Sequence, residues 1–350
     1  MKLIAAVPLV AILSAATPLA ATGLSVSTSA LERDAASVST TVSVSWRNAW
    51  RNERNHDAVW LFVRVAGKDG RSRPVRVARS GHTATGSLEI RTPEDRAGVF
   101  VFPSAAHRGD VTTKVRLELD ANSLPSDPVT AAVFGLEMVS IPAGPFFLGD
   151  VDPVALDYGG FFRAGQNGEP DGLFEVKSEA PIPVGPFAGG LDYRVKWAEY
   201  EGDRRGPVPA AFPKGTSPFY VMKYEITQGQ YAAFLNTLGD EASHFRAIHG
   251  GRDYAKHRGS ISLQSDGRYV AASPARPANR VSWDDGCAFA DWAGLRPMTD
   301  LEYVKAARGP EKPLARAFPW GTASRARVLR VVRPDDELVT TGDANEKLLN

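Results

Sequence analysis

The stretch YEITQGQYAAFL, residues 224–235, does most to decide the fold. Thr227 is followed three residues later by Gln230, which is a capping box: each side chain can satisfy a backbone N–H that the start of a helix leaves without a partner. The apolar residues that follow share one helical face, and they are Tyr231, Phe234, Leu235 and Leu238. The pattern predicts a short amphipathic helix that follows a strand at residues 219–224.

Two more helix starts follow the same pattern. Ser282 and Asp285 form a second capping box, and Thr299 and Glu302 form a third. The apolar positions and the terminating glycines are Phe289, Trp292, Ala293 and Gly294 for the former helix and Val304, Ala307 and Gly309 for the latter. Because glycine at a helix end and proline just beyond it are typical stop signals, we expect both helices to be short.

Residues 24–135 differ in character, because short alternating or apolar runs are separated by turn residues. The runs are residues 42–46, 59–65, 99–102 and 115–119. Their spacing predicts an all-β, sandwich-like module. We interpret Trp46, Trp50 and Trp60 as core residues of this module, with a ligand platform as the alternative.

Residues 151–216 are rich in glycine and proline and show no sustained strand or helix periodicity. This pattern is typical of an irregular, loop-rich segment. A long irregular stretch inside a domain is usually either functional or an insertion.

The composition excludes several classes of protein. The 350 residues contain 41 Lys plus Arg and 40 Asp plus Glu, so nothing favours binding to nucleic acid or to an anionic membrane surface. The chain is long enough to form a sizeable core without disulfides or structural metals. Cys287 is the only cysteine, so an internal disulfide is impossible.

The first residues predict export. Lys2 precedes an apolar run at residues 3–13, and small residues follow at 14–22. This is the pattern of a secretory signal peptide, here residues 1–22, with cleavage after Ala16 or near Ala21. We therefore expect a secreted or periplasmic protein with no membrane attachment after cleavage; an uncleaved N-terminal anchor is the alternative.

Five ordered segments together resemble the formylglycine-generating enzyme (sulfatase-modifying factor) family. They are residues 138–149 (MVSIPAGPFFLG), 224–235, 276–285 (RPANRVSWDD), 295–303 (LRPMTDLEY), and 306–309 with 318–321 (AARG and FPWG). Residues 46–51 and 55–60 resemble a β module that precedes this domain in some secreted bacterial members.

The resemblance implies an α+β fold: an irregular, C-type-lectin-like formylglycine-generating-enzyme fold preceded by an all-β sandwich-like domain. The expected organisation is a signal peptide at 1–22, a β-sandwich-like module at 24–135 and a partial family domain at 136–350. The family's later GN.WEW and RGGSW segments are missing, which we interpret as a C-terminal truncation.

The family also includes oxidases that convert a sulfatase cysteine into formylglycine, using Cu(I) held by a pair of cysteines. Soft thiolates suit Cu(I). This chain offers Cys287 alone, so no copper site is evident and we assign no catalytic residue. We interpret Cys287 as a small, inert core residue.

The sequence contains candidate ligands for two other metals, calcium and iron. The resemblance implies structural calcium a little beyond the FPWG turn, where Asn345 and Glu346 offer the oxygen ligands that Ca²⁺ prefers. His249, Asp253 and His257 follow one another at intervals of four residues and have the residue types of a two-histidine, one-carboxylate iron site. Two glycines after His249 make a helix doubtful there, so we interpret these three as surface residues.

Two functional hypotheses remain open. The first is a secreted, non-catalytic binding or accessory module whose partner is an unidentified protein or small ligand. The second is a formylglycine-generating oxidase that acts on sulfatase cysteines and is represented here by a fragment.

Overall fold

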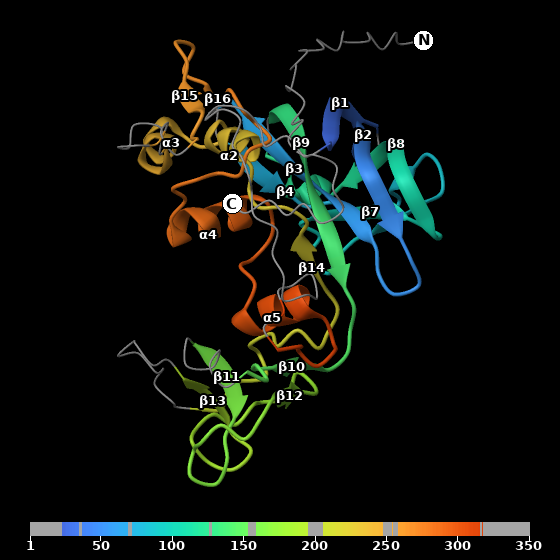
Figure 1. Cartoon of the computed structure of the whole chain (residues 1–350). Coiled ribbons are helices and arrows are strands. Elements are labelled where there is room, and N and C mark those ends of the chain that lie inside the picture. The colour runs from blue at the N-terminus through green and yellow to red at the C-terminus, as the bar shows by residue number, and fades with distance from the viewer. Residues whose placement is uncertain are drawn as a thin grey trace, which may run out of the picture. The chain divides into compact units, whose positions relative to one another are not determined.

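Figure 1 shows the computed structural model of the chain, which describes residues 23–34, 37–68, 72–125, 128–152, 159–194, 206–247, 254, 258–315 and 317. The chain forms two compact units, each made of two segments. Unit 1 comprises residues 1–139 and 222–297, and unit 2 comprises residues 140–221 and 298–350. No helix in the described part of the chain is both long and apolar enough to cross a membrane.

Unit 1 is built on two antiparallel sheets. Sheet A follows the order β1 (Ser25–Arg33), β2 (Val38–Arg51), β8 (His107–Leu119) and β5 (Thr83–Ala84). Sheet B contains β9 (Pro128–Ile141), β3 (Asp57–Gly67), β7 (Gly98–Pro103) and β6 (Leu88–Arg91) in that order, with β4 (Ser72–Val75) also paired to β3. A short 3₁₀ helix, Ala121–Ser123, follows β8.

The inner faces of the two sheets enclose one apolar core. Alternate residues of β3, from Val59 to Val65, face this core together with valines and leucines of β2, β7 and β8. Trp46 of β2 belongs to the same core and is fully buried. The predicted β-sandwich packing and the core role of Trp46 are therefore visible in the structure.

Three helices and a hairpin complete unit 1. They are α2 (Gln228–Leu235), α3 (Asp240–Arg246), α4 (Trp283–Trp292) and the hairpin of β15 (Ile261–Leu263) and β16 (Tyr269–Ala271). The helices gather on one side of the unit (Figure 1). Phe234 of α2 and Trp292 of α4 contact each other, with ring centroids 5.7 Å apart.

Unit 2 has much less regular structure. Its elements are the two-stranded sheets of β10 (Phe146–Leu148) with β12 (Phe174–Val176) and of β11 (Gly160–Arg163) with β13 (Leu191–Arg194), and the helix α5 (Asp300–Arg308). β14 (Phe219–Met222) runs across the division between the two units. A small core contains Phe146 and Leu148 of β10 and Leu301 of α5. The loop-rich prediction for residues 151–216 agrees with the scarcity of regular elements in the described part of that range.

The structure supports the predicted α+β class, since the regular structure of the described residues is mainly strand, with four α-helices. The predicted division into a β module at residues 24–135 and a family domain at residues 136–350 stays a prediction. The compact units are divided differently, because residues 222–297 belong with the N-terminal strands.

Candidate functional site

All three predicted capping boxes are present and fix where the helices begin. In α2, Thr227 N donates to Gln230 Oε1 at 3.0 Å and Gln230 N donates to Thr227 Oγ1 at 3.3 Å. The same reciprocal pair starts α4 at Ser282 and α5 at Thr299. As predicted, α5 ends at Gly309, whose φ of 76° suits glycine.

Gln228, inside the first motif, organises the loops around α2. Its Nε2 donates to the carbonyls of Arg258 and Pro277, at 3.0 and 3.2 Å. Its Oε1 accepts from both the backbone N–H and the hydroxyl of Ser260, at 2.8 and 2.6 Å. Such a buried, satisfied amide specifies loop geometry, and sequence periodicity gave no signal for it.

A buried ion cluster joins the two segments of unit 1. Lys223 Nζ donates to Asp57 Oδ2 at 3.0 Å and lies 3.4 Å from Glu137 Oε2. Asp57 Oδ1 also accepts from the backbone N–H of Trp50 at 2.9 Å. Burial alone would lower the pKa of Lys223, but the hydrogen bond to Asp57 and both carboxylate charges raise it. The cluster is suited to holding the segments together, since its polar atoms are turned toward one another.

Charged side chains also organise the loops of unit 2. One carboxylate oxygen of Glu179 accepts from the backbone N–H groups of Thr216 and Ser217 and from the Thr216 hydroxyl, and the other accepts from Lys214 N. Desolvation acts to raise the pKa of Glu179, but these hydrogen bonds bring it down to about 2. A carboxylate held in this way stays ionised and fixes the backbone of residues 214–217.

Two buried lysines have the complementary role. Lys214 Nζ donates to the carbonyls of Pro209 and Phe212, at 2.6 and 2.7 Å. Lys305 Nζ of α5 donates to the carbonyls of Gly144 and Gly215. Burial lowers the pKa of Lys305, while the nearby charge of Glu179 acts to raise it. These lysines donate hydrogen bonds to carbonyl groups that the irregular chain does not pair within a sheet.

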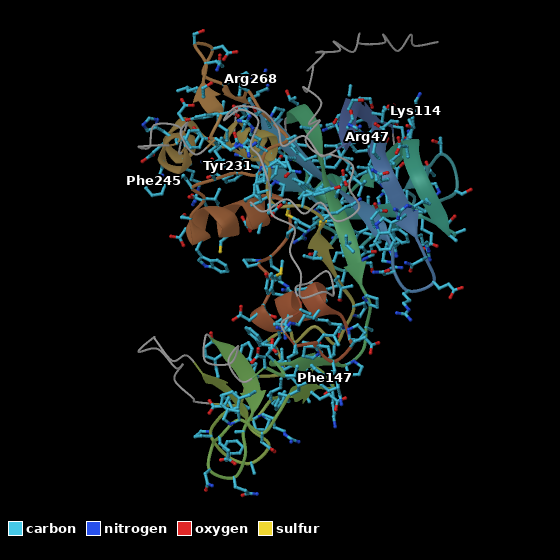
Figure 2. All side chains as sticks on the ribbon, viewed as in Figure 1. Arg47, Lys114, Phe147, Tyr231, Phe245 and Arg268 are labelled. Atoms are coloured by element: carbon cyan, nitrogen blue, oxygen red, sulfur yellow. The ribbon has the colours of Figure 1, made fainter. Side chains whose placement is uncertain are left out.

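The clearest exposed apolar feature is an aromatic surface on the α3 and α4 helices, formed by Phe245, Arg246, Trp283 and Asp285. Phe245 and Trp283 are 84% and 72% exposed, and Figure 2 shows Phe245 at the periphery of the helices. Arg246 Nη1 donates to Asp285 Oδ1 at 2.9 Å, which ties α3 to the start of α4. Exposed aromatic side chains beside a paired arginine are typical of binding surfaces.

Cys287 lies on α4, one helical turn after Trp283. It is a free thiol and only partly buried. The expectation that it is a core residue is therefore wrong, because the buried face of α4 is formed by Phe289 and Trp292.

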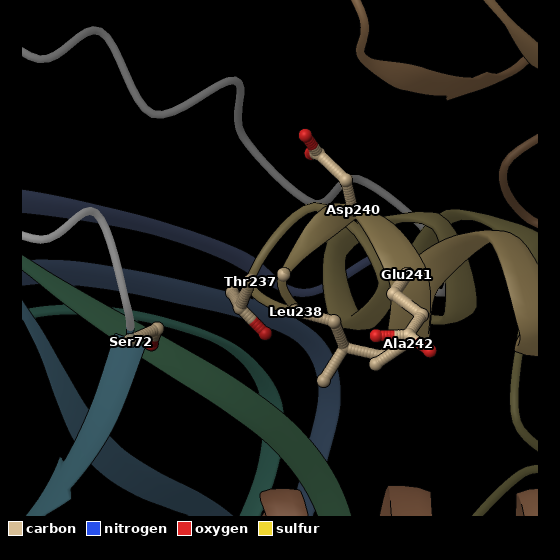
Figure 3. A pocket seen from close by; sticks show the side chains of 7 residues that line it. Ser72, Thr237, Leu238, Asp240, Glu241 and Ala242 are labelled. Atoms are coloured by element: carbon tan, nitrogen blue, oxygen red, sulfur yellow. The ribbon is translucent and has the colours of Figure 1, made fainter.

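Among the cavities that border the described residues is one in each unit. The larger, about 420 Å³, lies in unit 1 between Ser72 of β4 and residues 237–242 (Figure 3). The smaller, about 240 Å³, lies in unit 2 and is lined by residues of 163–171 and 188–189. The Arg163 guanidinium at its rim is paired with Asp171 at 2.8 Å. In the larger cavity the Ser72 hydroxyl accepts from Arg64 Nε at 3.0 Å, and the Thr237 hydroxyl donates to the Phe234 carbonyl at 2.7 Å.

The predicted metal ligands cannot be placed. Asn345 and Glu346, assigned to calcium, lie outside the described residues, and so do His249, Asp253 and His257. Among the residues that the structure does describe, no group of three or more His, Cys, Asp or Glu side chains is arranged to hold a metal ion. A two-thiolate copper site does not fit this chain, whose 350 residues contain one cysteine.

Short capped helices on a largely β scaffold, tied by buried polar groups, define an irregular α+β protein. The sulfatase-modifying factor enzyme 1-like domain family matches residues 164–337. The chain therefore belongs to the sulfatase-modifying factor family. The resemblances before residue 164, at 138–149 and in the β module, lie outside the matched range.

Curated relatives agree with this assignment. The formylglycine-generating enzyme of Thermomonospora curvata is 29% identical over 175 residues, which cover 42% of this chain and 53% of the relative. The enzyme of Bos taurus is 27% identical over 165 residues, covering 40% of this chain and 41% of the relative. The enzyme of Streptomyces coelicolor is 25% identical over 168 residues, covering 42% and 51%. The chain thus spans about half the length of these relatives or less, and no solved structure matches it significantly.

Proposed function

We propose that this chain acts as a non-catalytic binding or accessory module of the sulfatase-modifying factor family. The observation that carries the proposal is the single cysteine, Cys287. Oxidising a substrate thiol in the manner of the resembling oxidases needs a pair of thiolates on Cu(I). Cys287 lies on α4, is only partly buried, and is not among the buried residues of that helix. The methionines, at positions 1, 138, 222 and 298, are all distant from it in sequence.

The aromatic surface on α3 and α4 supports a binding role. It combines two large exposed rings, one on each helix, with the Arg246–Asp285 ion pair that links the helices. Aromatic and arginine side chains contribute most strongly to protein recognition. We propose this surface as the region where a partner binds, and leave the partner's class to experiment.

The test is an oxidation assay. The purified chain is incubated with Cu(I), O₂ and a peptide carrying Cys-x-Pro-x-Arg, and mass spectrometry follows conversion of the thiol to the aldehyde. We expect no turnover above a control without protein. A Cys287→Ser variant is the matched control, because turnover that survives it would point to ligands other than this thiol. Turnover in the parent chain would overturn the non-catalytic proposal.

The names of the relatives favour a second candidate, in which these residues are part of a longer formylglycine-generating oxidase. An in-frame downstream segment that carries two cysteines would favour this oxidase. The same oxidation assay on the longer protein then distinguishes the two candidates.

Three finer features are part of the proposal. We propose a C-type-lectin-like arrangement for the family domain, which an experimental structure would test.

We propose export, with the mature chain beginning between about residues 17 and 24. N-terminal sequencing of exported protein that begins at Met1 would contradict this proposal. We propose weak Ca²⁺ binding at Asn345 and Glu346, and calorimetry without a Ca²⁺ heat in the folded chain would contradict that.

A further inference from the structure

The outer face of sheet B carries side chains that a free sandwich would expose. Trp60, Phe62 and Arg64 of β3 alternate with the core-facing valines and leucine and point away from the sandwich core. Trp60 and Phe62 are nevertheless almost fully buried, and Arg64 is buried as well. An isolated two-sheet module would leave two aromatic rings and a guanidinium on this face in water.

These side chains bind the end of α4. Trp60 Nε1 donates to the carbonyl of Ala293 at 2.8 Å, and Arg64 Nη1 donates to the carbonyl of Trp292 at 3.1 Å. The last carbonyls of a helix have no partner within the helix. Strand β3 therefore supplies the C-terminal cap of α4, and the Arg64 cation also suits the negative end of the helix dipole.

Aromatic packing extends the same contact. The Trp292 ring lies 4.9 Å from that of Phe62 and 4.8 Å from that of Phe134 on β9, both edge to face. Trp292 also contacts Phe234 of α2 at 5.7 Å, so one ring connects both helices to the sheet. Gly98 on β7 leaves room for the Trp60 ring, because a Cβ at this position would lie 2.8 Å from that ring.

We infer that the outer face of sheet B is a docking surface whose partner is the chain's own segment 222–297, and that α2 and α4 keep their native structure only while docked on it. The Lys223–Asp57 ion pair is a further tie between the same two segments. The β module is then the platform on which the family-type helices fold. Trp60 is not available as a ligand platform, because its ring and its N–H are both engaged.

The test is hydrogen exchange of the full chain, measured by mass spectrometry. Trp60→Phe keeps an aromatic ring but removes the donor to Ala293, and Arg64→Met removes the donor to Trp292. We expect amides of α2 and α4 to exchange about ten- to hundredfold faster in each variant, since a buried carbonyl is left unpaired. Lys114→Met, at an exposed position of β8 on sheet A (Figure 2), is the matched control and should leave these amides unchanged.

The double variant makes the outcome decisive. If α2 and α4 amides keep their full protection when both donors are removed, the helices are stable by themselves and the inference is wrong. If they lose protection while β1, β2 and β8 keep theirs, the helices depend on the sheet as inferred.

Discussion

The two units of this chain are stabilised in different ways. Unit 1 has long paired strands and an extended apolar core, to which Trp46, Val59 and Leu117 belong. Unit 2 has short strands and a small core around Phe146 and Leu301. It adds buried charges, such as Lys214 and Lys305, whose ammonium groups bind backbone carbonyls. The difference follows from regularity: ladders satisfy the backbone of long strands, whereas irregular loops need side chains for this.

The comparison predicts where each unit is vulnerable. In unit 1, many other apolar contacts remain when one is lost, so a single substitution should destabilise the unit less. In unit 2, the core is small, so loss of one core residue or charged group should destabilise the unit more. The variants below test this difference, from the largest expected effect to the smallest.

Phe146→Ala should have the largest effect. Phe146 is fully buried in the small core, and the Lys305 Nζ atom lies 5.8 Å from its ring centroid. Removing the ring should lower the free energy of unfolding of unit 2 by about 3–5 kcal/mol. Hydrogen exchange should show lost protection in β10, β12 and α5 while β3 stays protected.

Phe147→Ala is the control, because the neighbouring ring is only partly buried and should cost no more than about 1 kcal/mol. Equal loss of protection in β3 after Phe146→Ala would mean that the units do not differ as described.

Acid should act on unit 1 through His56. Burial, together with the charges of Arg51 and Arg91, lowers the pKa of this imidazole to about 4. Between pH 6.5 and 4 the unfolded chain takes up the proton and the folded chain does not, so stability falls as pH falls through this window. The full loss is at most about 3 kcal/mol, and none of it applies above pH 6.5.

Urea unfolding at pH 7, 5 and 4 measures this loss. His56→Phe removes the titrating group but can still stack on Phe102, whose ring centroid lies 4.3 Å from that of His56. The variant should therefore be less sensitive to acid than the parent over the same range. An identical pH dependence in both proteins would rule out His56 as a cause.

Glu179→Gln tests the polar organisation of unit 2. The substitution keeps one acceptor but removes the charge and leaves some of the N–H groups of residues 214–217 poorly paired, at a cost of about 1–3 kcal/mol. In the parent, the low pKa of Glu179 means that its contribution is present above pH 4.5 and is lost as pH falls toward 2. Circular dichroism during acid titration measures this step.

Glu175→Gln is a suitable control, since that carboxylate forms a surface ion pair with the exposed Lys177 at 3.4 Å. If both variants respond to acid in the same way, the hydrogen bonds to Glu179 do not stabilise unit 2.

Cys287→Ser should have the smallest effect. Its thiol is partly exposed on a helix whose buried face is formed by Phe289 and Trp292, so we expect a loss of about 1 kcal/mol or less. Thermal melting measures the loss, and thiol labelling of the parent reports exposure. A loss of several kcal/mol would mean that α4 buries this face more deeply than the structure indicates.

Local patterns in the sequence predicted the local structure well. Thr227–Gln230, Ser282–Asp285 and Thr299–Glu302 predicted three helix starts because capping chemistry acts within four residues. The nearly continuous apolar run at residues 59–65 indicated a strand, but it could not show that both faces of the sheet would be covered. The prediction for Cys287 was wrong because a small residue is compatible with either the buried or the exposed face of a helix.

By itself, the sequence determined the three capped helices and the strands of the sandwich through periodicity and short motifs. Its ordered segments determined the resemblance to the family, and that resemblance implied the α+β class. Only the tertiary structure decided that α4 ends against Trp60 and Arg64, and that Glu179 lies among residues 214–217. These contacts join residues more than 30 positions apart. Their energy comes from desolvating and pairing groups that only the folded chain brings together, so no local pattern encodes them.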